Sequence, residues 1–111
     1  MDYLRKFSLE GKRAFVVGGL GLIGIEISRA LANAGAKTVA MDVQSNKGKI
    51  LTQELINAGY DFTFHHFDCS EVDKLESKFS RLLEEYHYHN IFINCSYPRT
   101  ANWGMNSFRD I

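Results

Sequence analysis

Glycines between an apolar stretch and a helical pattern have the spacing of a phosphate-binding turn. Residues 14–31 read "AFVVGGLGLIGIEISRAL", in which two spacings coincide. Gly19, Gly21 and Gly24 fit G-x-G-x-x-G, whereas Gly18 in place of Gly19 gives G-x-x-G-x-x-G. Glycine adopts positive φ readily and lets backbone amides approach a pyrophosphate closely. The chemistry expected of this segment is therefore the binding of a dinucleotide.

The residues after the glycines predict an amphipathic helix that begins at the turn. Its first N–H groups and the positive end of its dipole favour an anion. The backbone of Leu22 and Ile23 therefore joins Gly18, Gly21 and Gly24 as candidate cofactor-binding groups. The apolar positions at helical spacing are Ile23, Ile27, Ala30, Leu31 and Ala34. The alternative is a glycine turn that serves only the close packing of a helix on a strand.

Acidic residues follow the next two predicted strands. Asp42 comes after the strand expected around residues 37–41, roughly twenty residues beyond the glycine turn. There an acid can accept hydrogen bonds from both hydroxyls of an adenosine ribose and repel a 2′-phosphate, which favours NAD over NADP. Asp68 and Cys69 end the third predicted strand, "YDFTFHHFDC", where the carboxylate could accept from the adenine amino group. The alternatives are a solvated acid at Asp42 and, at Asp68, an acid that complements a helix dipole.

The fourth predicted strand ends in a further polar group. "NIFINCSY", residues 90–97, is short and apolar, which is typical of a strand buried on both faces. Asn94 and Ser96 at its end are the remaining candidate cofactor contacts. Ligands of parallel α/β sheets bind outside the carboxyl ends of the strands, so these residues are expected to face the same crevice as the glycine turn.

The periodicity switches repeatedly between strand and helix and predicts the order β-α-β-α-β-α-β. A second helix is expected over Ser45 to Ala58, and a third from Ser70, which forms a pattern close to a capping box with Asp73. The expected apolar faces are Leu51, Leu55 and Ala58 on the second helix and Val72, Leu75, Phe79, Leu82, Leu83 and Tyr86 on the third. This alternation predicts an α/β Rossmann-type parallel sheet of order 3-2-1-4 with helices on both faces, the third opposite the first two. The ligand crevice is expected between strands one and four.

Composition and charge limit the partners of the chain. Its 111 residues, 45% hydrophobic with a formal net charge of +0, are expected to form one globular domain. The balanced charge offers no basic field, so neither nucleic acid nor a membrane is expected as a partner. The start of the chain lacks the apolar core of a signal peptide, and a cytoplasmic location is expected. Cys69 and Cys95 are expected to be reduced, and no metal site is expected from their spacing.

These segments resemble the short-chain dehydrogenases/reductases over nearly the whole chain. "FSLEGKRAFVVGG" is similar to the start of the family's first strand, Asp42 to its NAD-selecting acid, "FDCSE" to its adenine-side Asp and "IFINCSY" to the strand before its N-N-A-G motif. The match favours G-x-x-G-x-x-G, with Gly18 as the first glycine and Gly19 incidental. Val17 stands where the family usually has Thr, and Leu22 where T-G-x-x-x-G-x-G requires a glycine. The N-N-A-G motif reads N-C-S-Y here.

One stretch resembles a narrower group. "INCSYPRTANWG" is similar to a bacterial subgroup associated with the synthesis of flagellin-glycan and surface-polysaccharide sugars. The resemblance implies an oxidoreductase that acts on a sugar or a sugar-derived carbonyl or alcohol, with Arg99 and Trp103 near the mouth of the substrate site. The alternative for these two residues is an irregular surface connection with one anchoring aromatic.

The acid–base pair of the family is missing. Its catalysis uses Tyr-x-x-x-Lys, and none of the five tyrosines here has a lysine four residues later. We therefore expect no catalytic residue and no hydride transfer in this chain. We expect residues 1–111 to be the amino-terminal, dinucleotide-binding half of a longer enzyme, and only the complete enzyme is expected to bind the small-molecule substrate. The alternatives are a non-catalytic nucleotide-binding module and part of a nucleotide-sugar epimerase or dehydratase. An open edge at the fourth strand also predicts self-association.

Overall fold

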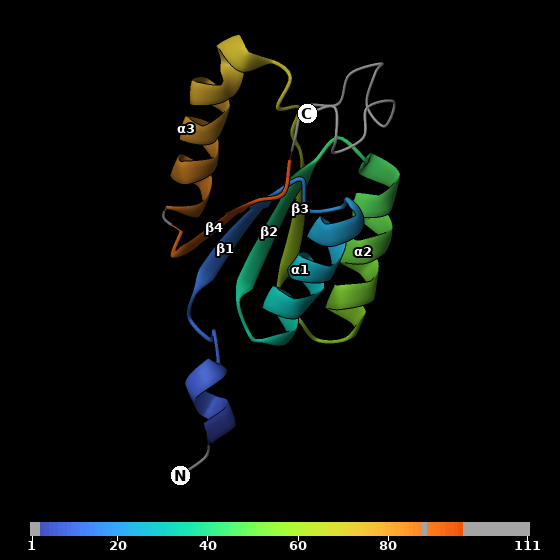
Figure 1. Ribbon diagram of the computed structural model, residues 1–111, viewed down its shortest axis with the longest axis vertical. Coiled ribbons are helices and arrows are strands. Elements are labelled where there is room, and N and C mark those ends of the chain that lie inside the picture. Colours follow the sequence, from blue (N-terminus) through green and yellow to red (C-terminus); the bar gives the residue numbers. More distant parts are fainter. Residues whose placement is uncertain (1–2, 88, 97–111) are drawn as a thin grey trace, which may run out of the picture.

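The computed structural model describes residues 3–87 and 89–96, which form a four-stranded parallel sheet with helices on both faces (Figure 1). The strands are β1 (Arg13–Val17), β2 (Lys37–Asp42), β3 (Phe62–His66) and β4 (Ile91–Asn94). The helices are α1 (Leu22–Asn33), α2 (Ser45–Asn57) and α3 (Leu75–Tyr86), with two short 3-10 helices, η1 (Tyr3–Phe7) and η2 (Val72–Lys74). The sheet order is β3-β2-β1-β4, so the predicted Rossmann-type topology is confirmed.

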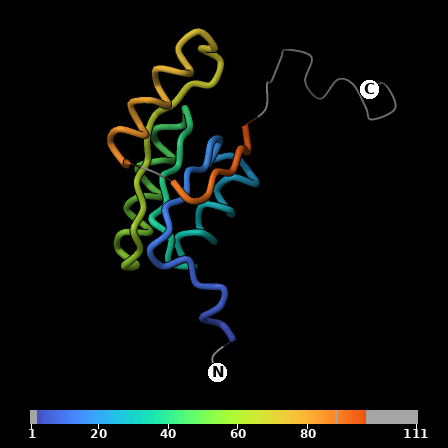
Figure 2. Tube along the Cα trace, turned by 90° about the vertical axis from the view of Figure 1, so that its left-hand side faces the viewer, coloured from blue at the N-terminus to red at the C-terminus, as the bar shows by residue number. Residues whose placement is uncertain are grey.

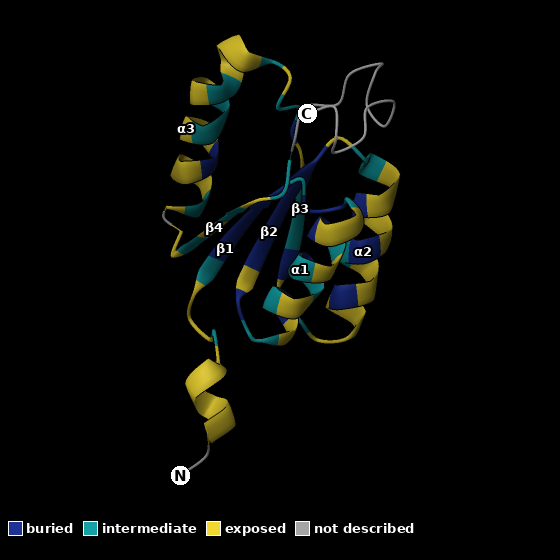
Figure 3. Ribbon diagram, viewed as in Figure 1, coloured by how far each residue is buried: buried dark blue, intermediate teal, exposed yellow. Residues whose placement is uncertain are grey.

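The strand registers align the carboxyl ends of the strands at one end of the sheet. Val17 pairs with Met41 of β2 and Asn94 of β4, and Asp42 pairs with His66 of β3. In the two central strands every residue after the first is buried, because helices cover both of their faces (Figure 3). The loops that follow the four strands therefore lie together at the carboxyl end of the sheet.

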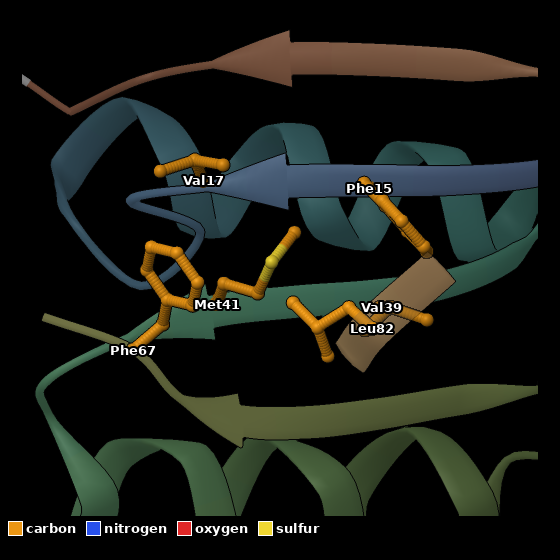
Figure 4. Packing of buried hydrophobic residues seen from close by; sticks show 6 residues of the cluster. All are labelled: Phe15, Val17, Val39, Met41, Phe67 and Leu82. Atoms are coloured by element: carbon orange, nitrogen blue, oxygen red, sulfur yellow. The ribbon is translucent and has the colours of Figure 1, made fainter. Parts of the chain in front are cut away.

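Two hydrophobic clusters hold the helices on opposite faces. The cluster between α3 and the sheet consists of Phe15, Val17, Val39, Met41, Phe67 and Leu82 (Figure 4). The cluster between the sheet and the helices α1 and α2 consists of Leu20, Ala32, Ala40, Leu51, Leu55 and Phe62. The predicted crossing of the third helix to the face opposite the first two is confirmed.

Helix α1 packs on the sheet through small side chains rather than through the apolar stripe predicted from spacing. Its buried residues are Gly24, Ser28 and Ala32, whereas Ile23 is 72% exposed and Ala30 is also exposed. The helix leaves a tight turn and lies close to the strands, so only small residues fit beneath its first turns. The prediction was wrong because it weighed hydropathy and ignored side-chain size.

The start of α3 also differs from the prediction. Ser70 does not cap this helix, which begins at Leu75 after η2, and its hydroxyl donates instead to the carboxylate of Asp68. The capping box was wrong because a nearby acceptor competes for the serine side chain. Leu82 is buried and Leu75, Phe79 and Tyr86 pack against the same cluster. Among the apolar positions predicted for the second and third helices, three are exposed: Ala58, Val72 and Leu83.

Strand β4 lies at an edge of the sheet. Within residues 3–87 and 89–96 it pairs only with β1, and burial alternates along it, with Phe92 47% exposed. The expectation of a strand buried on both faces was therefore wrong for this part of the chain, whereas the expected edge position of strand four is confirmed.

The amino-terminal 3-10 helix η1 extends away from the sheet (Figures 1 and 2). None of its residues is buried. In the ranges that the structure describes, no helix is long and apolar enough to cross a membrane.

Candidate dinucleotide-binding site

Backbone hydrogen bonds tie the glycine turn between β1 and α1 to the end of β2. The amides of Gly18 and Gly19 both donate to the carbonyl oxygen of Met41, at 2.8 and 3.3 Å. The amide of Gly21 donates to the carbonyl oxygen of Gly18 at 3.3 Å. Gly18 has a φ of +72°, in the left-handed region that favours glycine. The backbone of the turn is thus fixed by the neighbouring strand.

Contacts within the chain require three of the four glycines. A Cβ on Gly18 would lie 2.8 Å from the amide nitrogen of Ser96, and one on Gly24 would lie 2.0 Å from the carbonyl oxygen of Gly18. A Cβ on Gly19 would lie 2.8 Å from the Cβ of Ala40. Gly19, although incidental to the G-x-x-G-x-x-G spacing, is fixed by packing, because the turn lies directly on β2 at this residue. Close packing, the alternative to phosphate binding, accounts for these three glycines.

Gly21 and the first turn of α1 have no such internal explanation. A Cβ on Gly21 would meet only the carbonyl oxygen of Gly18, at an ordinary 3.7 Å. Leu22 is 93% exposed, and its amide and that of Ile23 belong to the first turn, which a helix leaves without intrahelical acceptors. An anion placed here would meet donor groups and the positive end of the helix dipole.

Asp42 is buried and holds the glycine turn from the side of β2. Its carboxylate accepts from the amide of Leu20 through Oδ2 and from the amide of Gln44 through Oδ1, both at 3.1 Å. The side chain of Gln44 donates in turn to the carbonyl oxygen of Leu20 at 3.4 Å. Only 9% of Asp42 is exposed, so the alternative of a solvated acid at this position was wrong. The negative charge lies beside the glycine turn, where an adenosine ribose is expected.

Asp68, after β3, is held by a serine two residues later. Its Oδ1 accepts from the amide of Ser70 at 2.9 Å and from the hydroxyl of Ser70 at 2.6 Å. These hydrogen bonds hold the pKa of the Asp68 carboxyl below its usual value. The carboxylate is therefore ionised at neutral pH and acts as an acceptor. Because α3 begins only after η2, an acid at the helix dipole is not its role in this structure.

Asn94, after β4, has the same local arrangement. Its Oδ1 accepts from the amide and the hydroxyl of Ser96, at 2.9 and 2.6 Å. The amide of Cys95 donates to the carbonyl oxygen of Val17 at 2.7 Å, which continues the pairing of β4 with β1. The close approach of Ser96 to Gly18 places this turn directly beside the glycine turn.

The thiol of Cys69 connects the two outer turns. Burial raises its pKa, and a hydrogen bond with Ser96 opposes that shift. A residue after β3 therefore contacts a residue after β4, although β2 and β1 lie between them in the sheet. Among the residues that the structure describes, no three His, Cys, Asp or Glu side chains are grouped to hold a metal ion.

The structure thus brings the predicted residues together at the carboxyl end of the sheet, around the glycine turn. Sequence reasoning missed three residues that shape the site: Leu20, Gln44 and Ser70. Ser70 follows an Asp by two residues, which is a signal for a side-chain turn, whereas no pattern indicates Gln44. Arg99 and Trp103, predicted near a substrate mouth, lie outside the described residues.

Comparisons with known proteins agree with this geometry. Galactitol 2-dehydrogenase of Rhizobium johnstonii is 32% identical over 94 residues, which are 85% of this chain and 36% of the relative. Post-translational flagellin modification protein A of Campylobacter coli is 28% identical over 101 residues, 90% of this chain and 40% of the relative. A solved structure of gluconate 5-dehydrogenase from Burkholderia cenocepacia, in complex with NADP and tartrate, matches with a TM-score of 0.76 at 25% identity, over 89% of this chain and 39% of the other.

The chain spans less than half the length of each of these proteins. A family profile described as short chain dehydrogenase matches residues 12–101, which include the glycine turn and every candidate contact. On that match, the chain belongs to the short-chain dehydrogenase family.

Proposed function

We propose that these 111 residues form the dinucleotide-binding part of a short-chain dehydrogenase. The observation that carries the proposal is the contrast between Gly21 and the other glycines of the turn. A Cβ at Gly21 would make only an ordinary contact, 3.7 Å from the carbonyl oxygen of Gly18, so packing within the described residues does not require a glycine there, whereas the close approach of a ligand would. The helix amides next to it supply donors for a pyrophosphate.

We propose further that the bound cofactor is NAD rather than NADP. The support is the buried carboxylate of Asp42, whose charge would repel a 2′-phosphate while its oxygens accept from ribose hydroxyls. NADP in the Burkholderia structure belongs to that protein, and the selectivity of this chain depends on its own residues.

For the whole enzyme we propose oxidation or reduction of a sugar or a sugar-derived alcohol or carbonyl. The galactitol and gluconate dehydrogenases among the relatives support this substrate class, and the Campylobacter relative supports a role in flagellin modification. Because Tyr-x-x-x-Lys does not occur in these 111 residues, proton transfer to the substrate would depend on other residues. With NAD as the hydride acceptor and gluconate or galactitol as the alcohol, the purified chain should therefore form no NADH, and a substrate-dependent rise in NADH absorbance above the protein-free rate would refute this.

Calorimetric titration tests the cofactor proposal. The parent chain should bind NAD more tightly than NADP, and Asp42→Ala should weaken NAD binding and reduce the preference. Asp61→Ala is a matched control, because Asp61 is an exposed acid that precedes β3 at the opposite end of the sheet. Equal NAD affinities of parent and Asp42→Ala would contradict the assignment of Asp42, and no binding of either dinucleotide by the parent would contradict the proposed function itself.

A further inference from the structure

Two turns at the carboxyl end of the sheet repeat the same arrangement. One reads Asp68-Cys69-Ser70 after β3, and the other reads Asn94-Cys95-Ser96 after β4. In both, the serine amide donates to Oδ1 of the first residue at 2.9 Å and the serine hydroxyl donates to the same oxygen at 2.6 Å. The chemical difference is that the first residue is an acid in one turn and its amide in the other.

In each turn the serine engages Oδ1 of the first residue and leaves the second polar atom of that side chain available. In the described part of the chain, no hydrogen bond engages Oδ2 of Asp68 or Nδ2 of Asn94. The turn after β3 therefore offers an acceptor, and the turn after β4 offers a donor. Neither Asp68 nor Ser70 belongs to the buried core, so the hydrogen bonds between them are not explained by core packing.

A nearby cation stabilises the turn after β3 without neutralising the carboxylate. Nζ of Lys78 donates to the carbonyl oxygen of Asp68 at 3.4 Å and to Oε1 of Glu71 at 2.7 Å. Across residues 3–87 and 89–96, no ion pair includes the Asp68 carboxylate. Glu71 thus binds the lysine, and Asp68 keeps a free charged oxygen at the carboxyl end of the sheet.

We propose that Ser70 is a positioning residue for adenine recognition: it fixes Oδ1 of Asp68, so that Oδ2 accepts from the exocyclic amino group of an adenine. The inference rests on the proposed dinucleotide-binding function. Its chemical basis is that an ionised carboxylate accepts from an amino group, whereas the protonated acid would present a donor. Asp68 is ionised at neutral pH with or without Ser70, so the role of Ser70 is to orient the carboxylate, and the lowered pKa of Asp68 reports the hydrogen bonds that do so.

The test compares NAD with nicotinamide hypoxanthine dinucleotide, in which an oxo group replaces the adenine amino group. Ser70→Ala should raise the Kd for NAD by roughly 3- to 10-fold, the range for one net hydrogen bond, and leave the Kd for the hypoxanthine analogue unchanged. Ser70→Thr keeps the hydroxyl and should restore NAD binding. Ser77→Ala is the matched control, because this exposed serine donates only to the carbonyl oxygen of Lys74.

The other turn provides an internal comparison. Ser96→Ala removes the same hydroxyl hydrogen bond from Asn94, whose remaining Nδ2 is a donor and cannot accept from an adenine amino group, and it also removes the hydrogen bond of Ser96 with Cys69. It should therefore change the Kd for the two dinucleotides by the same factor. Equal losses of both dinucleotides in Ser70→Ala would overturn the role of Ser70. No binding of either dinucleotide by the parent would instead overturn the proposed function.

A measurement on the ligand-free chain tests the positioning directly. Carbon-13 carboxyl NMR titration should show the pKa of Asp68 rising in Ser70→Ala and staying at the parent value in Ser77→Ala. A serine whose hydroxyl does not hold Oδ1 of Asp68 in solution would leave this pKa unmoved. An unchanged pKa in Ser70→Ala would therefore refute the inference even if NAD binding were weakened.

Discussion

The middle of the carboxyl end of the sheet and its two flanks are built differently. The middle consists of the glycine turn, residues 18–24, and Asp42, which are joined by backbone hydrogen bonds and contacts that leave no room for a Cβ at three positions. The flanks are the turns 68–70 and 94–96, in which a single serine holds each polar residue. The packed residues of the middle therefore serve folding as well as the proposed ligand binding, whereas Gly21 and the flank residues are not required by packing within the described chain.

The largest effect in the middle of the carboxyl end of the sheet is expected from Gly24→Ala, which adds a methyl group to the glycine turn. Gly24→Ala would place Cβ 2.0 Å from the carbonyl oxygen of Gly18, a backbone atom that cannot move without shifting the turn. We expect a loss of about 3 kcal/mol in the free energy of unfolding, measured with urea, because overpacking a rigid site has this cost.

Gly21→Ala is the matched control in the same turn. Its Cβ would meet the nearest atom at 3.7 Å, and its φ of −71° is open to alanine. The lower N-cap preference of alanine and the reduced entropy of the unfolded chain nearly cancel, so stability should change by less than about 1 kcal/mol while NAD binding weakens. Equal destabilisation by the two variants would contradict the distinction between packing and ligand-facing glycines.

The next largest effect should come from the two acids. Asp42→Ala leaves the amides of Leu20 and Gln44 without their acceptor in a buried site, which should lower the free energy of unfolding by about 1–3 kcal/mol. Asp68→Ala, in contrast, should leave the thermal midpoint at the parent value and weaken NAD binding. Differential scanning calorimetry and titration calorimetry on both variants check this. A lower thermal midpoint in Asp68→Ala would contradict the distinction between Asp42, which supports folding, and Asp68, which does not.

This contrast also explains how far the sequence alone could predict the molecule. Apolar strands, glycine turns and helical spacing predicted the positions of Asp42 and Asp68, because these depend on patterns within short segments. The sheet order followed from the alternation of strands and helices, because crossovers between parallel strands allow few topologies. The buried face of α1 was missed because it depends on the distance between helix and sheet, which admits Ser28 and excludes Ile23. The hydrogen bonds of Gln44 arise between segments distant along the chain, and no local pattern encodes them.

Strand β4 lies at the edge of the sheet and differs from the buried central strands in its exposure. Phe92 is 47% exposed on a strand that, in the described residues, pairs on one side only. Unpaired apolar edges favour association, and a lysine on an edge strand opposes it. Phe92→Lys should therefore reduce concentration-dependent association measured by light scattering. Val72→Lys is the control, because Val72 is 70% exposed but lies in η2, and an equal reduction by both variants would contradict an edge-specific mechanism.

The smallest expected effect concerns the ion pairs beside the flank at Asp68. Hydrogen bonds from Lys78 and Lys74 lower the pKa of Glu71. Because the folded pKa lies below the unfolded value, the stabilisation is complete above the unfolded value, about 4.3, and is lost as the pH falls through the folded pKa. Lys78→Met should therefore be slightly less stable than the parent at pH 7, and the difference in urea midpoint should shrink as the pH falls below about 4.

A remainder at low pH would measure two contacts of Lys78 that do not titrate in this range, the hydrogen bond to the carbonyl oxygen of Asp68 and the contact with an aromatic ring. Its Nζ lies 5.5 Å from the ring centroid of Phe67, an interaction that does not titrate in this range. Lys74→Met separates the two contributions, because Lys74 is 3.2 Å from Glu71 but its side chain is 68% exposed. It should show a smaller difference at pH 7 and almost none at low pH. A difference in Lys78→Met that stays constant between pH 7 and pH 3.5 would assign its effect to the contacts with Phe67 and the carbonyl oxygen of Asp68 and exclude a contribution from Glu71.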